Sequence, residues 1–315
     1  MYNQQKIAVV VPAYNEEELI GETLSSIPEY VDKVYAVDDC SSDRTYEIMQ
    51  KIAEENPKVV CIKHKENGGV GAAIVAGYKK ALQDRMDIAV VMAGDNQMDP
   101  AYLPDLLDPI VEGRADYTKG NRLFSPEYRK AMSRWRLFGN TLLTLLTKIA
   151  SGYWHVSDPQ NGYTAISRQT LERIDPDTIY TYYGYPNDML VKLNVYGFRV
   201  IDVPHPARYG KEKSKIKYSK YILKVSWLLL KCFFWRIKMK YLVLGMSPIF
   251  FLYLFGLVLA PLGAVLGVAS MFTRVVAGSL FVSEVVSSLI FITGALFLLF
   301  AMLFDIQMSR NGRNR

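Results

Sequence analysis

Short apolar runs alternate with longer mixed segments over roughly the first third of the chain. The runs read Lys6–Val11, Val34–Val37, Val59–Ile62 and Asp87–Met92, and a fifth strand is expected over Ala115–Lys119. Continuous apolar runs of this length are typical of strands buried on both faces of a parallel sheet. Repeated alternation of strand and helix predicts a doubly wound, mostly parallel α/β sheet with right-handed crossovers.

The mixed segments carry helix signals soon after the strands end. Asn15 is placed to cap a helix over Glu16–Ser26. Ser41 or Ser42 is placed to cap a second helix that runs to about Glu55. Small polar side chains at such positions accept hydrogen bonds from the free N–H groups of the first helical turn.

The pattern changes in the last part of the chain. Tyr241–Thr273 (33 residues) and Val285–Phe304 (20 residues) contain no charged residue. About 20 apolar residues span a bilayer core, and soluble helices rarely stay apolar all round for so long. We therefore expect two transmembrane helices in the cell membrane. Basic residues flank the pair, so the positive-inside rule predicts that both termini are cytoplasmic.

Basic residues are concentrated just before the first apolar run. The chain has a net charge of +6, and Arg208 to Lys240 alone holds eleven Lys or Arg and one acid. Trp227 and Trp235 are interleaved with these lysines. This mixture predicts a helix that lies on an anionic membrane, and it disfavours a nucleic-acid partner. The expected parts are a cytoplasmic domain (1–215), basic amphipathic juxtamembrane helices (216–240), a two-helix transmembrane hairpin (241–305) and a basic cytoplasmic tail (306–315).

Polar residues gather where the predicted strands end. The pairs after the first, second and fourth strands are Asn15 and Glu16, Asp38 and Asp39, and Asp95 and Gln97. The carboxyl ends of parallel strands share one edge, where open α/β sheets bind their ligands. Acidic clusters on one edge repel each other unless they hold a cation or donor groups. A nucleotide diphosphate supplies both, through its base, its ribose and a bound Mg²⁺.

Asp95 and Gln97 stand two residues apart, so both oxygens can face one hard cation. Mg²⁺ and Mn²⁺ suit such ligands. The alternative is an Asx-rich turn in which Asp99-Pro100 opens a helix. The stretch alone leaves both interpretations open.

The glycine run Gly68–Gly71 also has two interpretations. A dinucleotide-binding loop would follow the first strand and show the full G-x-G-x-x-G spacing. This run follows the third strand and lacks that spacing. A tight turn between strand and helix therefore fits at least as well.

Four polar blocks occur in order along the chain. They are Pro12-Ala-Tyr-Asn-Glu-Glu17, Val37-Asp-Asp-Cys-Ser-Ser-Asp43, Asn67-Gly-Gly-Val-Gly-Ala-Ala73 and Ala93-Gly-Asp-Asn-Gln-Met-Asp-Pro100. This succession resembles the family 2 glycosyltransferases, and most nearly the polyprenyl-phosphate (dolichol-phosphate) hexosyltransferases. The resemblance covers about residues 5–215 and implies a GT-A-like sheet. The apolar C-terminal pair also fits that group.

The resemblance implies roles on the donor side. Asp95 and Gln97 would hold Mg²⁺ or Mn²⁺, and Arg122 would reach the donor phosphates. The residues implied for the nucleotide sugar are Pro12, Ala13, Tyr14, Asn15, Glu16, Asp38, Asp39 and Gly69, with Arg208, Ser214 and Lys215 in a basic phosphate-gripping loop.

It also implies roles on the acceptor side. Asp158, in Ser157-Asp-Pro-Gln-Asn-Gly162, stands where the family has an active-site carboxylate. Asp188 is the rival candidate for a general base. Gln160 would help to bind the acceptor, together with Arg136 and Asn140 on a helix after the fifth strand. An ordinary amphipathic helix explains Arg136 and Asn140 equally well.

The chain departs from the family pattern at three places. Ala93 stands where the usual D-x-D has its first carboxylate, and Val70 stands where the glycine block often has a lysine. The spacer Lys211-Glu212-Lys213 is longer than usual before Ser-Lys. We therefore expect the metal ligands and the phosphate grip to differ from the family pattern, with Asp39 or a water in place of the missing carboxylate.

A phosphate acceptor needs little help from a base, because the second pKa of a phosphomonoester is about 6. We therefore expect inverting, metal-dependent transfer of a hexose to a polyprenyl or dolichyl phosphate. UDP-glucose is the favoured donor and GDP-mannose the alternative. The alternative of another class, motivated by Ala93, is a non-catalytic, membrane-tethered nucleotide-sugar-binding protein. Two transmembrane helices can also associate with those of a second copy of the chain, so the sequence is compatible with a homo-oligomer.

Overall fold

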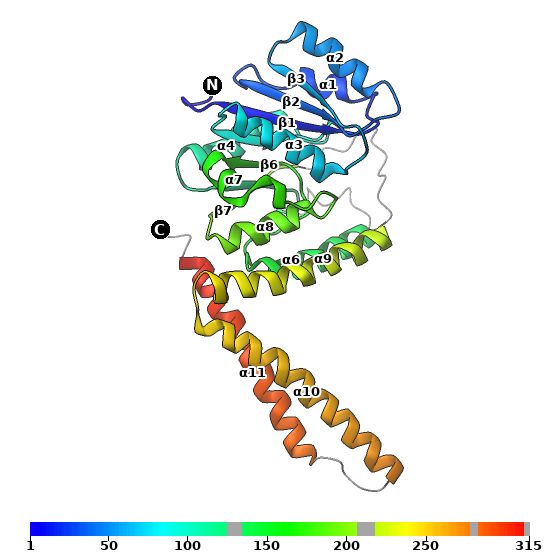
Figure 1. Ribbon diagram of the computed structural model, residues 1–315, viewed down its shortest axis with the longest axis vertical. Helices are drawn as coiled ribbons and strands as arrows, with labels where there is room; N and C mark the ends of the chain where they lie inside the picture. Colours follow the sequence, from blue (N-terminus) through cyan, green and yellow to red (C-terminus); the bar gives the residue numbers. More distant parts are fainter. Residues whose placement is uncertain (125–133, 207–217, 278–282, 312–315) are drawn as a thin grey trace. The chain divides into compact units, whose positions relative to one another are not determined.

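The computed structural model describes residues 1–124, 134–206, 218–277 and 283–311 (Figure 1). The chain divides into two compact units, Met1–Phe233 and Phe234–Arg315. The first unit contains the sheet and the polar strand ends. The second contains the long apolar helices.

A seven-stranded sheet forms the centre of the first unit. Its strand order is β3-β2-β1-β4-β6-β5-β7. β6 is antiparallel to β4 and β5, and every other neighbouring pair is parallel. The predicted mostly parallel α/β sheet is therefore confirmed. The strands are β1 (Ile7–Ala13), β2 (Lys33–Asp38), β3 (Val59–Lys63), β4 (Ile88–Val91), β5 (Tyr117–Asn121), β6 (Thr164–Ser167) and β7 (Val200–Pro204).

Helices cover both faces of the sheet, because successive side chains of a strand point to opposite faces. Val10 of β1 belongs to the core under α3, α7 and α8, whereas Val9 and Val11 belong to the core under α1, α2 and α4. The helices of this unit are α1 (Ile20–Ser25), α2 (Thr45–Glu55), α3 (Val70–Gln83), η1 (Pro100–Tyr102), α4 (Leu103–Val111), α6 (Arg134–Ser151), α7 (Arg168–Ile174), η2 (Pro176–Thr178), α8 (Tyr185–Val195) and α9 (Tyr218–Lys238), whose last turn belongs to the second unit.

α6 and α9 lie side by side and pack with α8 (Figure 1). Leu143 of α6, Val191 of α8 and Leu229 of α9 are buried in one apolar cluster. Leu223 and Trp227, one turn apart on α9, are 73% and 59% exposed. α9 therefore buries one apolar stripe and exposes another, as expected of an amphipathic helix that has a second apolar environment to cover.

Two predicted helix starts are wrong. α1 begins at Ile20 and α2 begins at Thr45, and neither N-cap residue makes a side-chain capping bond. Asn15 and Ser42 do not cap these helices because they bond to each other: Asn15 Oδ1 accepts from the backbone N–H of Ser42 at 2.8 Å. The small polar residues in these loops therefore join two strand ends rather than start two helices.

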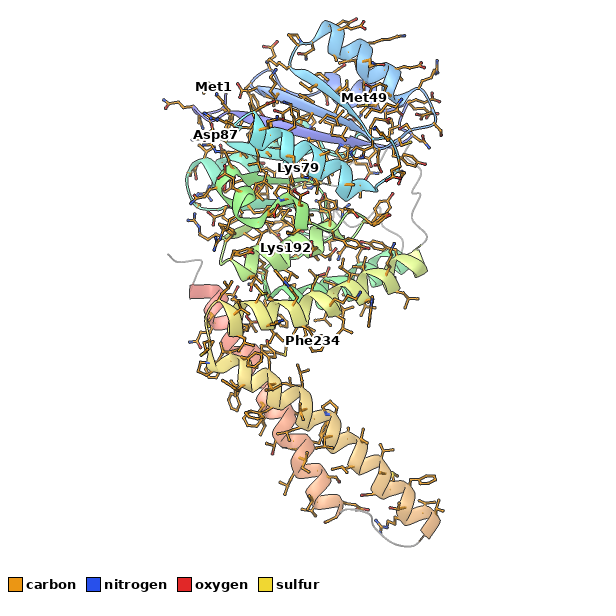
Figure 2. The ribbon with its side chains drawn as sticks, viewed as in Figure 1. Met1, Met49, Lys79, Asp87, Lys192 and Phe234 are labelled. Atoms are coloured by element: carbon orange, nitrogen blue, oxygen red, sulfur yellow. The ribbon has the colours of Figure 1, made fainter. Side chains whose placement is uncertain are left out.

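Two long apolar helices, α10 (Pro248–Ala277) and α11 (Glu284–Asn311), follow the short π-helix η3 (Met239–Val243) in the second unit. Pro248–Val276 and Glu284–Ser309 are long and apolar enough to cross a membrane. Their side chains are mostly carbon in Figure 2. The predicted pair of apolar C-terminal helices is confirmed.

Small residues and a buried ion pair hold this second unit together. A Cβ added at Gly294 would lie 2.2 Å from the backbone N of Ala260, so the two helix backbones are in contact there. Arg236 Nη1 donates to both oxygens of Asp305, at 3.0 and 2.8 Å, and the hydroxyl of Tyr253 donates to the same carboxylate at 3.2 Å. A buried charge needs this kind of full pairing to be tolerated.

Candidate active site

The loops after β1 and β2 are joined at the carboxyl edge of the sheet. The backbone N–H of Asn15 donates to Ser41 Oγ at 2.9 Å, and that of Glu16 donates to Thr45 Oγ1 at 2.8 Å. Pro12 and Ala13 are buried in β1, while the side chain of Tyr14 is 41% exposed. The structure therefore brings the first predicted block against the second.

The two acids after β2 are buried and have different partners. Asp38 is fully buried at the end of β2, next to Ala13 in the strand register. The carboxylate of Asp39 accepts from the backbone N–H groups of Gly68 at 3.0 Å and Gly69 at 2.8 Å. Its Oδ1 also lies 2.8 Å from Nδ1 of His64. Asp39 therefore anchors the glycine loop (residues 67–71), a role that the sequence did not indicate.

The loop after β4 places Asp95 and Gln97 at the same edge. The backbone N–H of Gly94 donates to Pro12 O at 3.1 Å, so this loop lies against the end of β1. Asn96 has a φ of 58°, and the backbone N–H of Gln97 donates to Asp95 Oδ1 at 3.2 Å. One carboxylate and one amide oxygen are hard donors of the kind that Mg²⁺ or Mn²⁺ takes beside substrate phosphates. The donor set fits a divalent cation.

The turn interpretation holds for the second half of this loop. Asp99 Oδ1 accepts from the backbone N–H of Ala101 at 2.9 Å and caps η1, with Pro100 at the first helical position. Ala93 donates its backbone N–H to Met98 Sδ at 3.1 Å. Asp99 therefore acts as a cap, and Asp95 is the candidate metal ligand.

Arg122 and Asp158 form an ion pair in which both side chains are largely buried. Arg122 Nε donates to Asp158 Oδ2 at 2.8 Å, Nη2 donates to Oδ1 at 3.2 Å, and the backbone N–H of Arg122 donates to Oδ2 at 3.2 Å. Burial alone would raise the pKa of Asp158, but Arg122 and Lys119 outweigh it and lower that pKa. Asp158 is therefore held as a carboxylate and is a poor proton acceptor.

Sequence reasoning missed two charged residues beside this pair. Lys119 is fully buried in β5, and its Nζ donates to Asn161 O. Burial lowers the pKa of Lys119 to about 8, although Asp158 and Asp202 act in the opposite direction. Asp202 neighbours Lys119 in the β5–β7 register, and burial raises its pKa to about 6. Lys119 is the last residue of the predicted fifth strand, which is only a weak signal of burial.

The Asp202→Asn variant should be more stable than the wild type above pH 6. The folded-state pKa of Asp202, about 6, lies above its ordinary value of 3.8, so its ionisation opposes folding. Wild-type stability contributed by this group is thus lost as pH rises from about 4 to about 6. In the wild type, the backbone N–H of Ser157 donates to Asp202 Oδ2 at 2.7 Å. An asparagine oxygen at this position can accept the same hydrogen bond. Melting temperatures should agree near pH 4 and differ near pH 7. A less stable variant near pH 7 would mean that attraction to Lys119 outweighs burial.

The 157–163 loop is fixed beside these charges. Asn161 Nδ2 donates to Nε2 of His205 at 2.8 Å, and His205 Nδ1 donates to the next backbone carbonyl at 2.9 Å. Gln160 Oε1 lies 3.5 Å from Thr144 Oγ1 of α6, one turn after the buried Asn140. Gln160 Nε2 is buried and has no hydrogen-bond acceptor within the part of the chain that the structure describes. An anion oxygen bound there would satisfy this amide.

Gly120 is needed for the close approach of this loop to β5. A Cβ at position 120 would lie 2.4 Å from Nε2 of His205 and 2.8 Å from Nδ2 of Asn161. Gly120→Ala should therefore lower the free energy of unfolding by about 1–3 kcal/mol. Gly21→Ala is the matched control, because its nearest neighbour is Cγ2 of Ile48 at 3.6 Å and alanine is favoured in a helix. Equal stabilities of the two variants in urea titrations would contradict this prediction.

Asp188, the rival base, has both carboxylate oxygens engaged by the protein. Its Oδ2 accepts from the backbone N–H of Tyr180 at 2.9 Å and from Lys192 Nζ at 2.5 Å, and Cys232 Sγ donates to Oδ1 at 3.6 Å. Asp188 is only 6% exposed, and Lys192, which is labelled in Figure 2, is 9% exposed. These contacts tie α8 to α9 and favour a structural role over that of a base.

Four of the predicted residues are not characterised. Arg208, Ser214 and Lys215 lie outside the described residues, and so does the side chain of Arg136, although its backbone is part of α6. The basic phosphate-gripping loop therefore stays a prediction. Asn140 and Gln160 are the acceptor-side residues whose positions are known.

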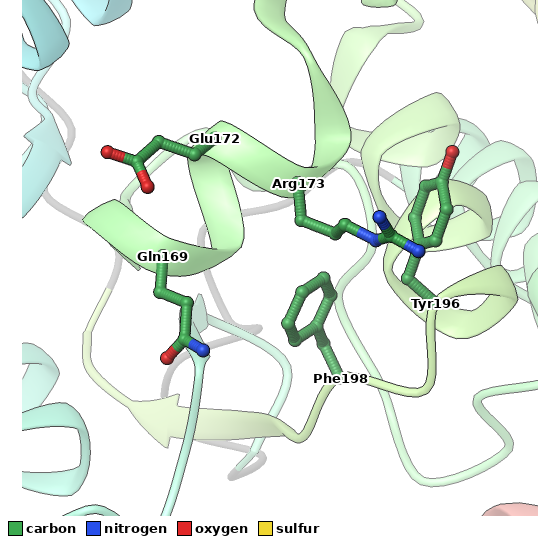
Figure 3. A pocket seen from close by; sticks show the side chains of 5 residues that line it. All are labelled: Gln169, Glu172, Arg173, Tyr196 and Phe198. Carbon is green, nitrogen blue, oxygen red and sulfur yellow. The ribbon is translucent and has the colours of Figure 1, made fainter.

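The amino edge of the sheet carries a shallow depression of about 500 Å³. Gln169, Glu172 and Arg173 of α7 line it with Tyr196 and Phe198, which precede β7 (Figure 3). The guanidinium of Arg173 lies 5.2 Å from the ring centre of Tyr196. No predicted site residue lines this depression, which lies opposite the edge that binds ligands in such sheets.

The sequence from residue 8 to residue 175, more than half of the chain, matches the family model described as glycosyl transferase family 2. The chain belongs to glycosyl transferase family 2. This segment of the family 2 glycosyltransferase contains Asp38, Asp39, Asp95, Arg122 and Asp158. The family resemblance of the four sequence blocks is thereby confirmed.

Curated relatives and a solved structure agree with this assignment. The family 2 glycosyltransferase is 35% identical over 179 residues to the UDP-N-acetylglucosamine–dolichyl-phosphate N-acetylglucosaminyltransferase of Methanococcus voltae, covering 53% of this chain and 71% of the relative. It is 29% identical over 209 residues to the dolichol-phosphate mannosyltransferase of Pyrococcus furiosus, covering 63% and 55%. The glucosyl-3-phosphoglycerate synthase of Mycobacterium tuberculosis, crystallised with Mn²⁺, UDP and phosphoglyceric acid, has the same fold, with a TM-score of 0.54. The two chains are 18% identical, and the match covers 74% of this chain and 78% of the synthase.

Proposed function

We propose that this family 2 glycosyltransferase transfers a hexose from a nucleotide-diphosphate sugar to the phosphate of a membrane polyprenyl or dolichyl lipid. The main support for this proposal is the set of charged and polar residues at the carboxyl edge of the sheet. Asp38 and Asp39, the Asp95–Gln97 donor set and Arg122 lie at or just after the ends of β2, β4 and β5, and Asp158, which pairs with Arg122, precedes the antiparallel β6, which begins at the same edge. The two relatives are named for transfer to dolichyl phosphate and dolichol phosphate, which supports a lipid acceptor for this chain.

Asp95 and Gln97 would hold Mg²⁺ or Mn²⁺ at this edge. When bound, the cation stabilises negative charge on the departing diphosphate. The fold neighbour crystallised with Mn²⁺ and UDP is in line with this use of a divalent metal. Because Ala93 supplies no carboxylate, a cation bound here would rely more on substrate phosphates for its ligands than one in a site with two acids.

Arg122 supplies fixed positive charge for the same step. Its bidentate pairing with Asp158 holds the plane of the guanidinium, and Lys119 adds a second buried cation nearby. Preorganised charge of this kind stabilises a leaving diphosphate without rearrangement during the reaction. The acceptor phosphate is already an anion, since its second pKa is about 6, so its attack needs no base. Direct attack on the anomeric carbon inverts the configuration of the sugar.

The acceptor phosphate would bind near Gln160 and Asn140. The buried amide nitrogen of Gln160 lacks an acceptor within the described residues, and Asn140 lies one turn from the threonine that contacts Gln160. Leu223 and Trp227 give α9 an exposed apolar stripe among lysines, which suits the surface of an anionic membrane. With two apolar helices beyond it, we propose a cell-membrane protein whose catalytic domain and termini are cytoplasmic.

A donor panel tests the proposal and selects the sugar. Purified full-length protein, undecaprenyl phosphate and Mn²⁺ would be incubated with labelled UDP-glucose, UDP-N-acetylglucosamine or GDP-mannose. We expect lipid-soluble label with a UDP-hexose, UDP-glucose being favoured, and an inverted anomeric configuration by NMR. Label from GDP-mannose alone would overturn the uridine preference. No label with any donor, together with tight nucleotide binding, would favour the non-catalytic alternative that Ala93 motivates.

A further inference from the structure

A short aromatic segment lies between the glycine loop, in which Gly69 is a predicted nucleotide-sugar residue, and α9, which the proposed function assigns to the membrane surface. Residues 180–185, Tyr-Thr-Tyr-Tyr-Gly-Tyr and here named the tyrosine segment, join η2 to α8. The segment contacts the glycine loop (67–71) on one side and α9 on the other. Neither its hydrogen bonds nor its exposed rings are explained by the mechanism above.

The tyrosine segment sets the shape of the glycine loop. The backbone N–H of Ala72 donates to Thr181 O at 3.0 Å. A Cβ added at Gly69 would lie 2.7 Å from Cδ1 of Tyr182, and Gly69 has a φ of +88°, which L side chains rarely adopt. A Cβ at Gly71 would lie 2.3 Å from Tyr180 O. The glycine loop is therefore in direct van der Waals contact with this segment.

The same segment contacts α9. Nζ of Lys224 lies 4.6 Å above the ring centre of Tyr182, which is a cation–π geometry. A Cβ at Gly184 would lie 2.5 Å from Cδ2 of Leu228. Both contacts involve the part of α9 that belongs to the first unit.

The Tyr182 ring is therefore placed between the glycine loop and α9. It is 44% exposed, so it contributes little to the core and its removal should not unfold the protein. The contacts form a continuous series. Asp39 accepts from the N–H groups of Gly68 and Gly69, Gly69 touches Tyr182, and Tyr182 lies under Lys224.

We propose that Tyr182 is a positioning residue that couples the glycine loop to α9, so that nucleotide affinity depends on where α9 is held. This rests on the proposed function, because it takes the glycine loop to line the nucleotide pocket. α9 carries the apolar stripe and lysines that suit a lipid surface. The coupling therefore makes the pocket most competent when the enzyme is seated on the membrane that contains its acceptor. Linkage also requires the reverse effect, in which bound nucleotide orders α9.

Nucleotide affinity of single variants tests the coupling. Full-length protein would be placed in nanodiscs containing anionic lipid, and dissociation constants for UDP and GDP with Mn²⁺ would be measured by calorimetry. We expect Tyr182→Ala to weaken binding of the preferred nucleotide about tenfold and Lys224→Met about threefold, as loss of packing and of a cation–π contact implies. Tyr182→Phe keeps the ring and should bind within about twofold of the wild type.

Lys231→Met is the matched control. Lys231 lies on the same helix and its Nζ is 5.4 Å from the ring centre of Trp227, also on α9, so the variant removes the same charge and the same kind of contact without touching the tyrosine segment. Its nucleotide affinity should equal that of the wild type. Equal weakening by Lys224→Met and Lys231→Met would overturn the proposal in favour of a general charge effect.

Hydrogen exchange distinguishes coupling to α9 from a purely local packing role of Tyr182, because a local role would not change the exchange of α9 amides. UDP with Mn²⁺ should protect the backbone amides of residues 221–230 in the wild type and leave them unprotected in Tyr182→Ala. Nucleotide binding without protection of this stretch in the wild type, or unchanged affinity in Tyr182→Ala, would refute the coupling and leave the proposed function intact. Failure of the wild type to bind either nucleotide would overturn the proposed function and this inference with it.

Discussion

Asp95→Ala should reduce the rate of sugar transfer by about a thousandfold or more. Asp95 is the one carboxylate of the candidate donor set, since Ala93 replaces the other acid of the usual motif and Gln97 offers an amide. Without it, only an amide and the substrate would hold the proposed cation at the departing diphosphate. Initial rates with the preferred donor and undecaprenyl phosphate, over a range of Mn²⁺ concentrations, would measure the loss.

The neighbouring acid provides the control. Asp99→Ala removes a carboxylate from the same loop, but Asp99 caps η1 through the backbone N–H of Ala101. The expected result is a loss of about 1 kcal/mol of stability with catalysis largely retained. Mn²⁺ binding, followed by electron paramagnetic resonance in the presence of UDP, should weaken in Asp95→Ala and persist in Asp99→Ala. If Asp95→Ala kept more than about a tenth of wild-type activity, another residue would have to hold the metal.

Much of the fold was predictable because buried strands leave a strong local pattern. The first four strands occur where continuous apolar runs predicted them, and the polar ends of β1, β2 and β4 follow from the same runs. β6 (Thr164–Ser167) was not predicted, and it is antiparallel to both of its neighbours. A four-residue strand carries no local signal of its direction, which is set by the tertiary pairing of β4 and β5.

The site was predictable only in its residue types. Asn15 and Ser42 look like helix caps in sequence, but each has the other as a partner across two loops. Asp39 was expected to contact base and ribose, and its carboxylate is used to hold the glycine loop. Lys119 ends a predicted strand, where an exposed lysine is common, and its burial follows from β6 and β7 packing on both sides of β5. Such roles depend on contacts between distant segments, which one sequence does not contain.

Single loss of Asp158 should lower stability strongly, and single loss of Arg122 should lower the rate of sugar transfer strongly. The two residues are 36 positions apart and share a bidentate pairing in which Asp158 is fully buried. Asp158→Asn leaves the charges of Arg122 and Lys119 without their central carboxylate, and removing one partner of a buried pair costs about 3–5 kcal/mol. Arg122→Gln should reduce transfer by about a hundredfold to a thousandfold, because a charge aimed at the diphosphate is lost. Denaturant titrations and initial rates would be measured on the same preparations.

The double variant separates the structural part of this pair from its catalytic part. If the Arg122–Asp158 pairing is mutual, Arg122→Gln with Asp158→Asn should be more stable than the sum of the two single losses predicts, by about 1–3 kcal/mol, since two amides can bond to each other and no guanidinium is left without its carboxylate. Its activity should remain as low as that of Arg122→Gln, because stability is restored but the positive charge is not. Additive stabilities would show that the two side chains act independently. Recovery of activity in the double variant would show that the charge of Arg122 serves only to neutralise Asp158, and not to stabilise the leaving diphosphate.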